Sequence, residues 1–246
     1  MKKDLFKILL ASFLLIGCSE DKKSGEIKFA TSAEYPPFEY HEGGEIKGFD
    51  VELARLIAKE LGKEAIFENM QFSTILPTLQ NGLVDAAIST ITITDERKKN
   101  IDFSNPYYTE SMATVFVKDN PITDKAQLPQ KKIACQLGTT MEIWLKKHVP
   151  TAEIIPLDNN NLAIEALKVG HVEVVLVDAI QGAVFSKKNP GLSYAVIGSS
   201  DTGYGVAFKK GSPLKDQINK ALQALEEKGE LQKLKQEWLE ETPWKN

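Results

Sequence analysis

The sequence predicts an α/β fold in two lobes that face each other across a cleft. Short apolar strands alternate with amphipathic helices, which is the pattern of sheets covered by helices. The alternation runs through residues 27–117 and begins again at residue 131, so we expect two separate cores. A chain of 246 residues, of which 42% are hydrophobic, is long enough to bury both.

The first set of elements is marked by helix caps and by glycines at helix ends. Asp50 and Ser73 precede apolar residues at helical spacing, and Gly62 and Gly82 follow them. Two prolines at residues 36–37 require an extended loop. The expected order is strand 27–31, loop 32–38, helix 51–61, strand 65–67, helix 74–81, strand 84–88 and strand 112–117.

The second set repeats this pattern and leads into the last helices. Asn159 can cap a helix that Gly170 ends, and Ser212 followed by Pro213 is a preferred helix start. The expected order is strand 131–135, helix 142–148, strand 154–155, helix 160–169, strand 172–177, strand 194–197, strand 205–208 and helices 213–228 and 231–238.

The chain crosses between the two sets twice, and two extended crossings make a natural hinge. We expect lobe 1 to consist of residues 26–113 and 206–246, and lobe 2 of residues 118–203. Residues 114–117 and 204–205 are the expected hinge segments. A cleft between lobes is a common place for a small-ligand site.

The N-terminus has the pattern of a secretion signal. A basic stretch precedes an apolar run at residues 8–16 that is too short to span a bilayer. The sequence LIGC at residues 15–18 resembles a bacterial lipobox, which implies removal of residues 1–17 and lipidation of Cys18; the alternative is a plain signal peptide that carries a cysteine. Residues 18–25 would then be a tether, and we expect a lipid-anchored protein in the periplasm or at the cell surface.

Composition argues against several classes of protein. The net charge of −4 and the lack of a basic stripe with aromatics argue against a general nucleic-acid binder. Two cysteines and three scattered histidines show no metal-ligand spacing, so we expect no metal and no cofactor. If Cys18 carries lipid, Cys135 has no disulfide partner and is expected to be a buried, inert thiol in a strand.

Residues 85–97 are the stretch around which we expect a site. A buried strand gives way there to hydroxyl side chains, among them Thr90 and Thr92, and Arg97 follows. Ligands of open α/β sheets bind at the carboxyl ends of strands, and arginine can hold a carboxylate through two parallel hydrogen bonds. The stretch predicts a site for a small carboxylate; the alternative is a threonine-rich strand end with a surface arginine.

Five motifs occur in an order and spacing that resemble one known family. They are EYPPFEY at 34–40, GFDVELA at 48–54, ITITDER at 91–97, IDFSNPYY at 101–108 and GTT at 138–140. Over residues 26–238 the chain resembles the polar and basic amino-acid family of bacterial solute-binding proteins, which serve ABC importers of arginine, lysine, ornithine or glutamine. The resemblance implies a two-lobed periplasmic-binding-protein fold (type II) with two crossover hinge strands, closing on one L-amino acid.

The resemblance also implies which residues hold the amino and carboxyl groups of the ligand. The α-carboxylate would bind the guanidinium of Arg97 and the backbone N–H groups of Thr92 and Thr140. The amino group would meet Asp178, the carbonyl group of Thr90 and the hydroxyl of Thr92. An arginine side chain suits the first role because it is always charged and binds carboxylates through two bonds.

Two of these positions have a further physical basis. Residues 138–140 open a helix, whose free N–H groups and dipole favour an anion. Asp178 ends a buried strand, where an unpaired carboxylate is costly, so a ligand ammonium group is a suitable partner. Asp178 can also cap a helix from Ala179 onward, and the two roles are compatible. Ile91 and Thr139 adjoin these positions and belong to the expected site.

The side chain of the ligand would lie between aromatic rings that match Tyr35 and Phe72. Prolines beside Tyr35 favour a rigid, exposed ring that stacks on an alkyl or guanidinium group, with loop packing as the alternative. Phe72 could instead be an apolar residue that packs ahead of its helix. Glu34 could face a cationic side chain, with Ser32 and Glu39 near in sequence; the alternative is a solvated loop charge.

The motifs around residues 34–39 and 48–52 look most like those of arginine or basic amino-acid binders. We therefore expect L-arginine first, lysine or ornithine next, and glutamine as the neutral alternative. Met141 departs from the pattern, because several basic amino-acid binders have glutamine at this position.

Two other function classes compete with a transport receptor. A few relatives are periplasmic dehydratases of prephenate-type compounds, in which Glu34 could serve as the acid; no nucleophile–base pair supports catalysis, so we expect no enzyme. A sensor usually carries a transmembrane helix and a signalling domain after the lobes, and the sequence ends at Asn246 with neither. The expected partners are an ABC permease and its ATPase, and the expected state is a monomer.

Overall fold

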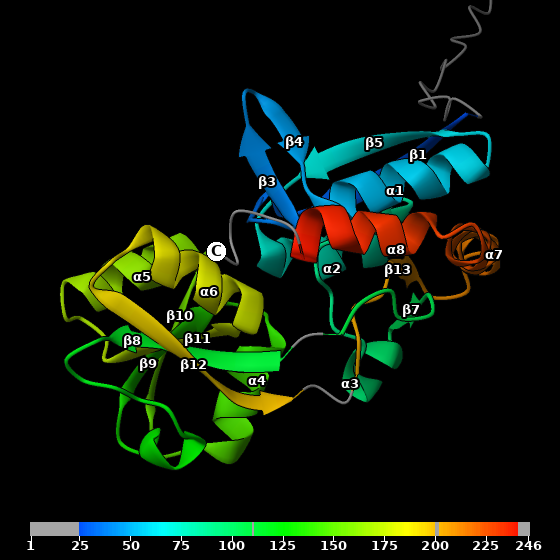
Figure 1. Ribbon diagram of the computed structural model, residues 1–246. Helices are drawn as coiled ribbons and strands as arrows, with labels where there is room; N and C mark the ends of the chain where they lie inside the picture. Colours follow the sequence, from blue (N-terminus) through cyan, green and yellow to red (C-terminus); the bar gives the residue numbers. More distant parts are fainter. Residues whose placement is uncertain (1–24, 110, 200–201, 241–246) are drawn as a thin grey trace, which may run out of the picture.

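The first lobe is a mixed sheet with helices on both faces. The computed structural model describes residues 25–109, 111–199 and 202–240 (Figure 1). The elements of the first lobe are β1 (Glu26–Thr31), β2 (Glu34–Tyr35), β3 (Glu39–Glu42), β4 (Glu45–Lys47), α1 (Phe49–Glu60), β5 (Glu64–Asn69), α2 (Phe72–Gln80), β6 (Ala86–Ala87), α3 (Asp95–Lys98), β7 (Ile101–Phe103), β13 (Ala207–Lys209), α7 (Leu214–Glu227) and α8 (Glu230–Lys235), with a π-helical turn at Gln236–Glu240.

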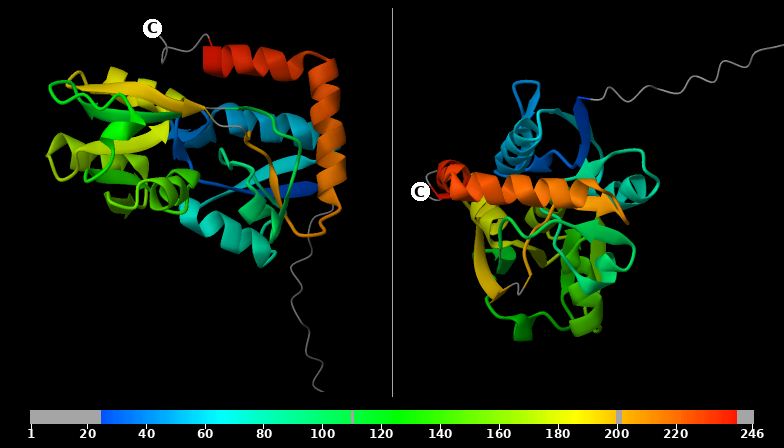
Figure 2. Two further views of the ribbon diagram at one scale, coloured as in Figure 1. Left: turned by 90° about the horizontal axis from the view of Figure 1, so that it is seen from below. Right: turned by 90° about the vertical axis from the view of Figure 1, so that its right-hand side faces the viewer.

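The main sheet of this lobe has the strand order β5-β1-β6-β13-β7. β1 runs parallel to β5 and β6, while β13 runs antiparallel to β6 and β7. Phe29 packs in one core with α1, α7 and α8, and the next residue, Ala30, packs in the other core with α2. Both faces of β1 are therefore buried, which explains its short apolar run. Figure 2 shows α7 along the edge of this lobe away from the second lobe.

The second lobe repeats the same construction. Its elements are β8 (Ser111–Val117), a 3₁₀ turn (Lys125–Gln127), β9 (Lys132–Gln136), α4 (Thr140–His148), β10 (Glu153–Leu157), α5 (Asn160–Lys168), β11 (Val174–Asp178), α6 (Ala179–Lys188) and β12 (Leu192–Ser199). The strand order is β10-β9-β11-β8-β12, with β9 parallel to β10 and β11 and with β8 antiparallel to β11 and β12. Alternate residues of β11 pack toward α4 and toward α5 and α6, so this strand is buried on both faces. The predicted α/β fold in two lobes is confirmed.

The predicted boundary between the lobes requires a correction at β8. Residues 114–117, expected as a hinge segment, pair with β11 and β12 inside the second sheet. This segment belongs to lobe 2, because it pairs on both sides inside the second sheet. Residues 111–113, the end of the range expected for lobe 1, belong to the same strand and therefore also to lobe 2. Residues 204–205, the other expected hinge segment, are bound to lobe 1: the Tyr204 N–H donates to the Tyr108 carbonyl (2.8 Å) and the Gly205 N–H to the Ile91 carbonyl (3.1 Å).

Two helix starts also differ from the prediction. α1 begins after Gly48, and the side chain of Asp50 turns into the protein instead of capping the helix. α2 begins at Phe72 after Gln71, so Ser73 lies within its first turn. Sequence spacing alone does not reveal that tertiary contacts of Asp50 compete with capping. α3 begins after Thr94, whose hydroxyl accepts a hydrogen bond from the Arg97 N–H (3.2 Å).

Cys135 lies fully buried in β9, as predicted, and burial raises the pKa of its thiol to about 12. Within the described ranges, no helix is long and apolar enough to cross a membrane. The expected signal and tether, including Cys18, lie outside the described residues.

Candidate ligand-binding site

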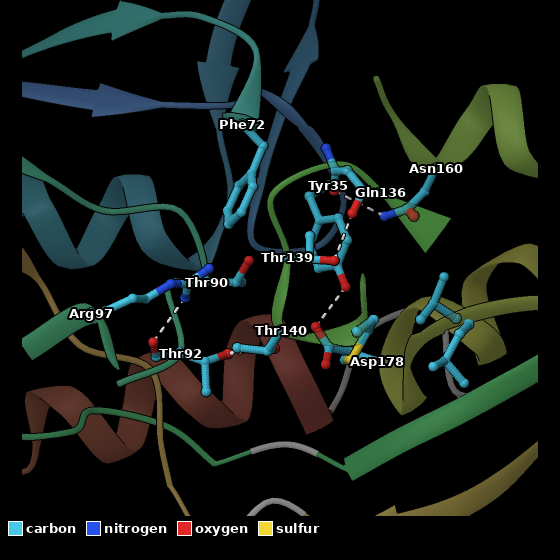
Figure 3. Close-up of a pocket in the computed structure, with 13 residues that line it drawn as sticks. Tyr35, Phe72, Thr90, Thr92, Arg97, Gln136, Thr139, Thr140, Asn160 and Asp178 are labelled. Carbon is cyan, nitrogen blue, oxygen red and sulfur yellow. Dashed lines mark hydrogen bonds between the residues drawn. The ribbon is translucent and has the colours of Figure 1, made fainter. Parts of the chain in front are cut away.

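A cavity lies where β6, β9 and β11 end, and residues of both lobes line it (Figure 3). We call it the main cavity. It is lined by Tyr35, Phe72, Thr90, Thr92, Arg97, Gln136, Thr139, Thr140, Met141, Asn160, Leu176, Val177 and Asp178. A continuation, the outer extension, shares Tyr35, Phe72, Thr90, Gln136 and Asn160 with it and adds Ser32, Glu34 and Glu39. The structure thus brings together nearly all the predicted site residues.

Ile91 is the exception among them. Its side chain is fully buried in the core beneath α2 and does not line the cavity. Thr90 and Thr92, the residues on either side, both reach the cavity. Successive side chains of an extended segment point in opposite directions, so the inclusion of Ile91 in the site was wrong.

Arg97 is a buried cation at one end of the main cavity. Its guanidinium donates to the carbonyl groups of Thr92 (2.8 Å) and Gly138 (3.0 Å), and it lies 6.0 Å from the ring centroid of Phe72. Burial lowers the pKa of Arg97 to about 10, so the group stays charged at neutral pH. No carboxylate in the described ranges forms an ion pair with it. A buried charge that lacks a counterion favours an anionic ligand.

Thr90 adopts a backbone conformation that is unusual for a residue with a side chain. Its φ angle is 47°, in the left-handed region. The Asp50 carboxylate accepts the Thr90 N–H (2.7 Å) and the Tyr107 hydroxyl (2.8 Å), and these bonds hold the turn in place. Asp50 therefore shapes the cavity without lining it. Sequence reasoning assigned it to a helix cap and missed this role.

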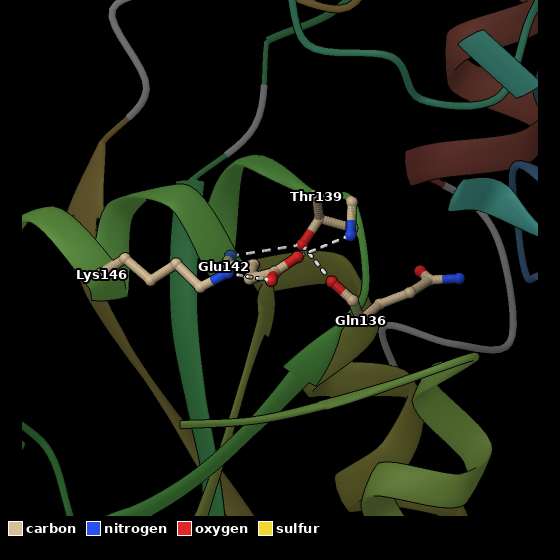
Figure 4. A network of polar contacts seen from close by, with 5 residues as sticks. Gln136, Thr139, Glu142 and Lys146 are labelled. Carbon is tan, nitrogen blue, oxygen red and sulfur yellow. Dashed lines mark hydrogen bonds and ion pairs between the residues drawn. The ribbon is translucent and has the colours of Figure 1, made fainter. Parts of the chain in front are cut away.

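The start of α4 forms the opposite wall, and its amide groups are used differently from the prediction (Figure 4). Thr139 caps α4, accepting from the Glu142 N–H (3.4 Å) and donating to the Gln136 carbonyl (2.7 Å). The Gly138 N–H donates to the carboxylate of Glu142 (2.7 Å), which also pairs with Lys146 (2.6 Å). The protein's own carboxylate thus takes the Gly138 amide, which we expected to be free for an anion.

Asp178 is the buried acid of the second lobe. Its carboxylate accepts a hydrogen bond from the Tyr35 hydroxyl of the first lobe (2.6 Å). Burial raises the pKa of Asp178, and no Lys or Arg of the described ranges pairs with it. Asp178 precedes α6 but makes no capping hydrogen bond, so the second role we expected for its side chain was wrong. The carboxylate points to the cavity instead.

Several contacts join the two lobes around the cavity. Besides the Tyr35–Asp178 bond, the guanidinium of Arg97 reaches Gly138 in the second lobe. The hydroxyls of Thr92 and Thr140 lie 3.4 Å apart, and the buried side chain of Gln181 donates to the Pro36 carbonyl. The cavity is therefore enclosed by residues that bond across it.

Gln136 and Asn160 are cavity residues that sequence reasoning missed. The Asn160 amide nitrogen donates to Gln136 Oε1 (3.3 Å), and Gln136 Nε2 donates to the Asp158 carbonyl (3.2 Å). Asn160 Oδ1 is buried and accepts no hydrogen bond from the described residues. Gln136 is the last residue of β9 and Asn160 lies shortly after β10, and these two strands are parallel. The rule that identified residues 85–97 could therefore have found both residues.

Comparisons with known proteins agree with this geometry. The chain matches the bacterial extracellular solute-binding proteins, family 3, over residues 27–241. It is 36% identical over 250 residues to the arginine-binding extracellular protein ArtP of Bacillus subtilis (strain 168), covering 97% of this chain and 98% of that protein. This chain is a family 3 bacterial extracellular solute-binding protein.

Solved structures extend the comparison of this solute-binding protein to three dimensions. An ancestral arginine-binding protein bound to arginine has 38% identity and a TM-score of 0.82, covering 87% of this chain and 98% of that one. An ancestral arginine-binding protein bound to glutamine has 38% identity and a TM-score of 0.84, covering 88% and 99%. The two-lobed fold of the solute-binding protein and its family resemblance are confirmed, and the family places the protein in the periplasm or at the cell surface.

Proposed function

We propose that this solute-binding protein is the receptor of an ABC importer and binds one L-amino acid with a cationic side chain, L-arginine before lysine or ornithine. One observation carries the proposal: Arg97 and Asp178, buried groups of opposite charge that form no ion pair with another described residue, line the same cavity. An amino acid is a zwitterion, so its carboxylate and ammonium groups match the two charges.

The outer extension supports a cationic side chain. Tyr35 and Phe72 line the route from the main cavity into it, and their rings suit an alkyl or guanidinium group. The extension also carries acceptor oxygens, namely those of Glu34, Glu39 and Asn160. Glu34 is exposed, whereas Glu39 and Asn160 are buried, so the buried pair contributes most to recognition.

Calorimetry on refolded, ligand-free protein tests this proposal. We expect arginine to bind most tightly, then lysine and ornithine, with glutamine weaker. Tighter binding of glutamine would contradict the preference for a cationic side chain, but it would still agree with an amino-acid receptor. No binding of any of the four would contradict the receptor itself.

We also propose that the protein has no catalytic activity of its own. The described residues that line the main cavity include no serine or cysteine that could act as a nucleophile. A dicarboxylate such as prephenate would place a second negative charge near Asp178, which disfavours it. Purified protein should leave prephenate and arogenate unchanged; turnover of either would overturn this part of the proposal.

Delivery to a permease completes the proposed role. The anchor would be a lipid on Cys18, and the receptor would act as a monomer that docks on the permease and its ATPase through the lobe surfaces. Mass spectrometry of protein from the membrane fraction should show an N-terminal lipidated cysteine at residue 18. An unmodified Cys18 would contradict the anchor alone.

A further inference from the structure

Two carboxyl groups lie together beneath the outer extension. Glu39 on β3 and Asp50 on α1 are 1% and 0% exposed, and their side chains are hydrogen-bonded to each other. No Lys or Arg forms an ion pair with either of them in the described ranges. Such a pair is costly to bury with both groups ionised, so it holds a proton between its members.

Two of the four carboxyl oxygens of the pair could still accept a bond from a positive group. Glu39 Oε1 accepts from the Ser89 hydroxyl (2.8 Å), and Asp50 Oδ2 accepts from Thr90 and Tyr107. The other two oxygens, Glu39 Oε2 and Asp50 Oδ1, accept no hydrogen bond from a donor of the described protein. The remaining charged groups near the pair are acidic, because Asp178 acts on Glu39 and Glu34 lines the same extension.

Both acids are therefore hard to ionise. Burial, the charge of Asp50 and the hydrogen bond that Glu39 donates to Asp50 raise the pKa of Glu39 well above its ordinary value. Burial raises the pKa of Asp50 to about 7, against the opposing effect of its hydrogen bonds to Thr90, Tyr107 and Glu39. Near neutral pH the pair therefore retains protons that two free carboxylates would have lost.

Glu39 connects this pair to the ligand. It lines the outer extension together with Asn160, whose Oδ1 also lacks a donor. A ligand side chain that extended from Arg97 and Asp178 into the outer extension would meet these residues. A positive charge there favours the ionised form of the acid pair and lowers its pKa.

We propose that Glu39 and Asp50 share a proton while the site is empty, and that binding of a cationic side chain beside Glu39 releases this proton. This inference rests on the proposed amino-acid receptor function. The proton passes to solvent and the charge of the ligand replaces it, so the buried site keeps the same net charge. A neutral side chain cannot make this exchange and leaves the proton in place.

Proton linkage gives a direct measurement. Titration calorimetry of arginine near pH 7, in phosphate and in Tris, reports released protons through the different ionisation heats of the two buffers. We expect up to about one proton released per arginine, and an arginine affinity that rises up to about tenfold per pH unit between about pH 6 and 8. L-citrulline, which has the shape of arginine without its charge, should release none.

Substitution of Glu39 tests whether the released proton comes from the acid pair. In Glu39→Gln the acid pair is gone, so the proton release on arginine binding should vanish and the ratio of arginine to citrulline affinity should fall at least about tenfold. Glu42→Gln is the matched control: Glu42 lies on the same strand, is exposed and pairs with Lys47. It removes a carboxylate outside the cavity and should keep the proton release of the wild type.

The outcomes separate the two proposals. Arginine binding with no proton released, or with equal release for citrulline, overturns the role of the acid pair and leaves the receptor function standing. Release that persists in Glu39→Gln also overturns it. If no basic amino acid binds, the proposed receptor function fails instead. The comparison of arginine with citrulline on wild-type protein decides the matter even if the variant does not fold.

Discussion

Arg97 and Asp178 are buried in the cavity wall, and neither forms an ion pair with another residue that the structure describes. The guanidinium of Arg97 donates to the carbonyl groups of Thr92 and Gly138, and the carboxylate of Asp178 accepts hydrogen bonds from tyrosine hydroxyls. Each arrangement orients the charged group while leaving its charge uncompensated. The two residues therefore recognise what all amino acids share, and the outer extension selects among side chains.

Removal of the guanidinium tests the carboxylate contact. We expect Arg97→Ala to weaken arginine binding by about 2–5 kcal/mol, a loss of roughly 30-fold or more, because the ligand carboxylate would lie buried without a cation. Calorimetry measures the affinity, and Lys98→Ala is the control because Lys98 is an exposed cation of the same helix. An Arg97→Ala affinity close to that of the wild type would contradict the assigned role.

Cys135 gives a prediction about reactivity. The thiol is fully buried and its pKa is raised to about 12, so almost no thiolate forms near pH 8. We expect iodoacetamide to leave Cys135 unmodified in the folded protein and to alkylate it in concentrated urea. Mass spectrometry of the peptide that contains residue 135 measures both. Rapid alkylation of the folded protein would show that β9 opens far more readily than its burial indicates.

At the scale of elements, the turn before α4 controls how closely the lobes approach. Gly138 has a φ angle of 81°, and a β-carbon there would lie 3.2 Å from the Cα atom of Ser73 on α2. The turn thus needs glycine both for its backbone conformation and for its contact with the other lobe. It also presents the carbonyl group that Arg97 reaches.

Gly138→Ala should therefore weaken both folding and ligand binding. The left-handed conformation costs about 1–2 kcal/mol for a residue with a side chain, and the contact with Ser73 adds a penalty to the closed arrangement. Gly170→Ala is the matched control, because Gly170 has a φ angle of 75° with no atom within 4 Å of the added carbon. Urea unfolding should show similar losses in both variants, whereas calorimetry should show weaker arginine binding only in Gly138→Ala. Equal affinities would contradict the proposed role of the contact.

The two lobes together make the site at the scale of the whole molecule. Hydrogen bonds of Tyr35, Arg97 and Gln181 cross from one lobe to the other around the cavity. A ligand that bridges Arg97 and Asp178 adds contacts to both lobes at once. Its binding should therefore stabilise the folded molecule as a unit.

Ligand-linked unfolding measures this coupling. At a free arginine concentration about 100 times its Kd, we expect the free energy of unfolding to rise by about 2.7 kcal/mol. Urea unfolding with and without arginine gives the value, and Arg97→Ala should show little increase at the same concentration. A wild-type protein whose unfolding midpoint does not move with arginine would contradict binding to the folded state.

The sequence by itself determined the two sets of strands and helices, the buried thiol and the stretch that carries Thr90, Thr92 and Arg97. These features follow from local patterns: apolar periodicity, caps, glycines and the position of polar residues after strands. The family resemblance added Tyr35, Phe72 and Asp178, and all three line one cavity in the structure.

Only the tertiary structure decided the contacts between segments that lie far apart in the chain. In the structure Asp50 supports Thr90 instead of capping a helix, and β8 lies in the second sheet. The Gly138 N–H donates to Glu142 instead of being free for a ligand. The structure also pairs Glu39 with Asp50 beneath the outer extension. The physical reason is that distance and burial decide which of several possible partners a polar side chain binds. Both are fixed only when the two lobes are folded.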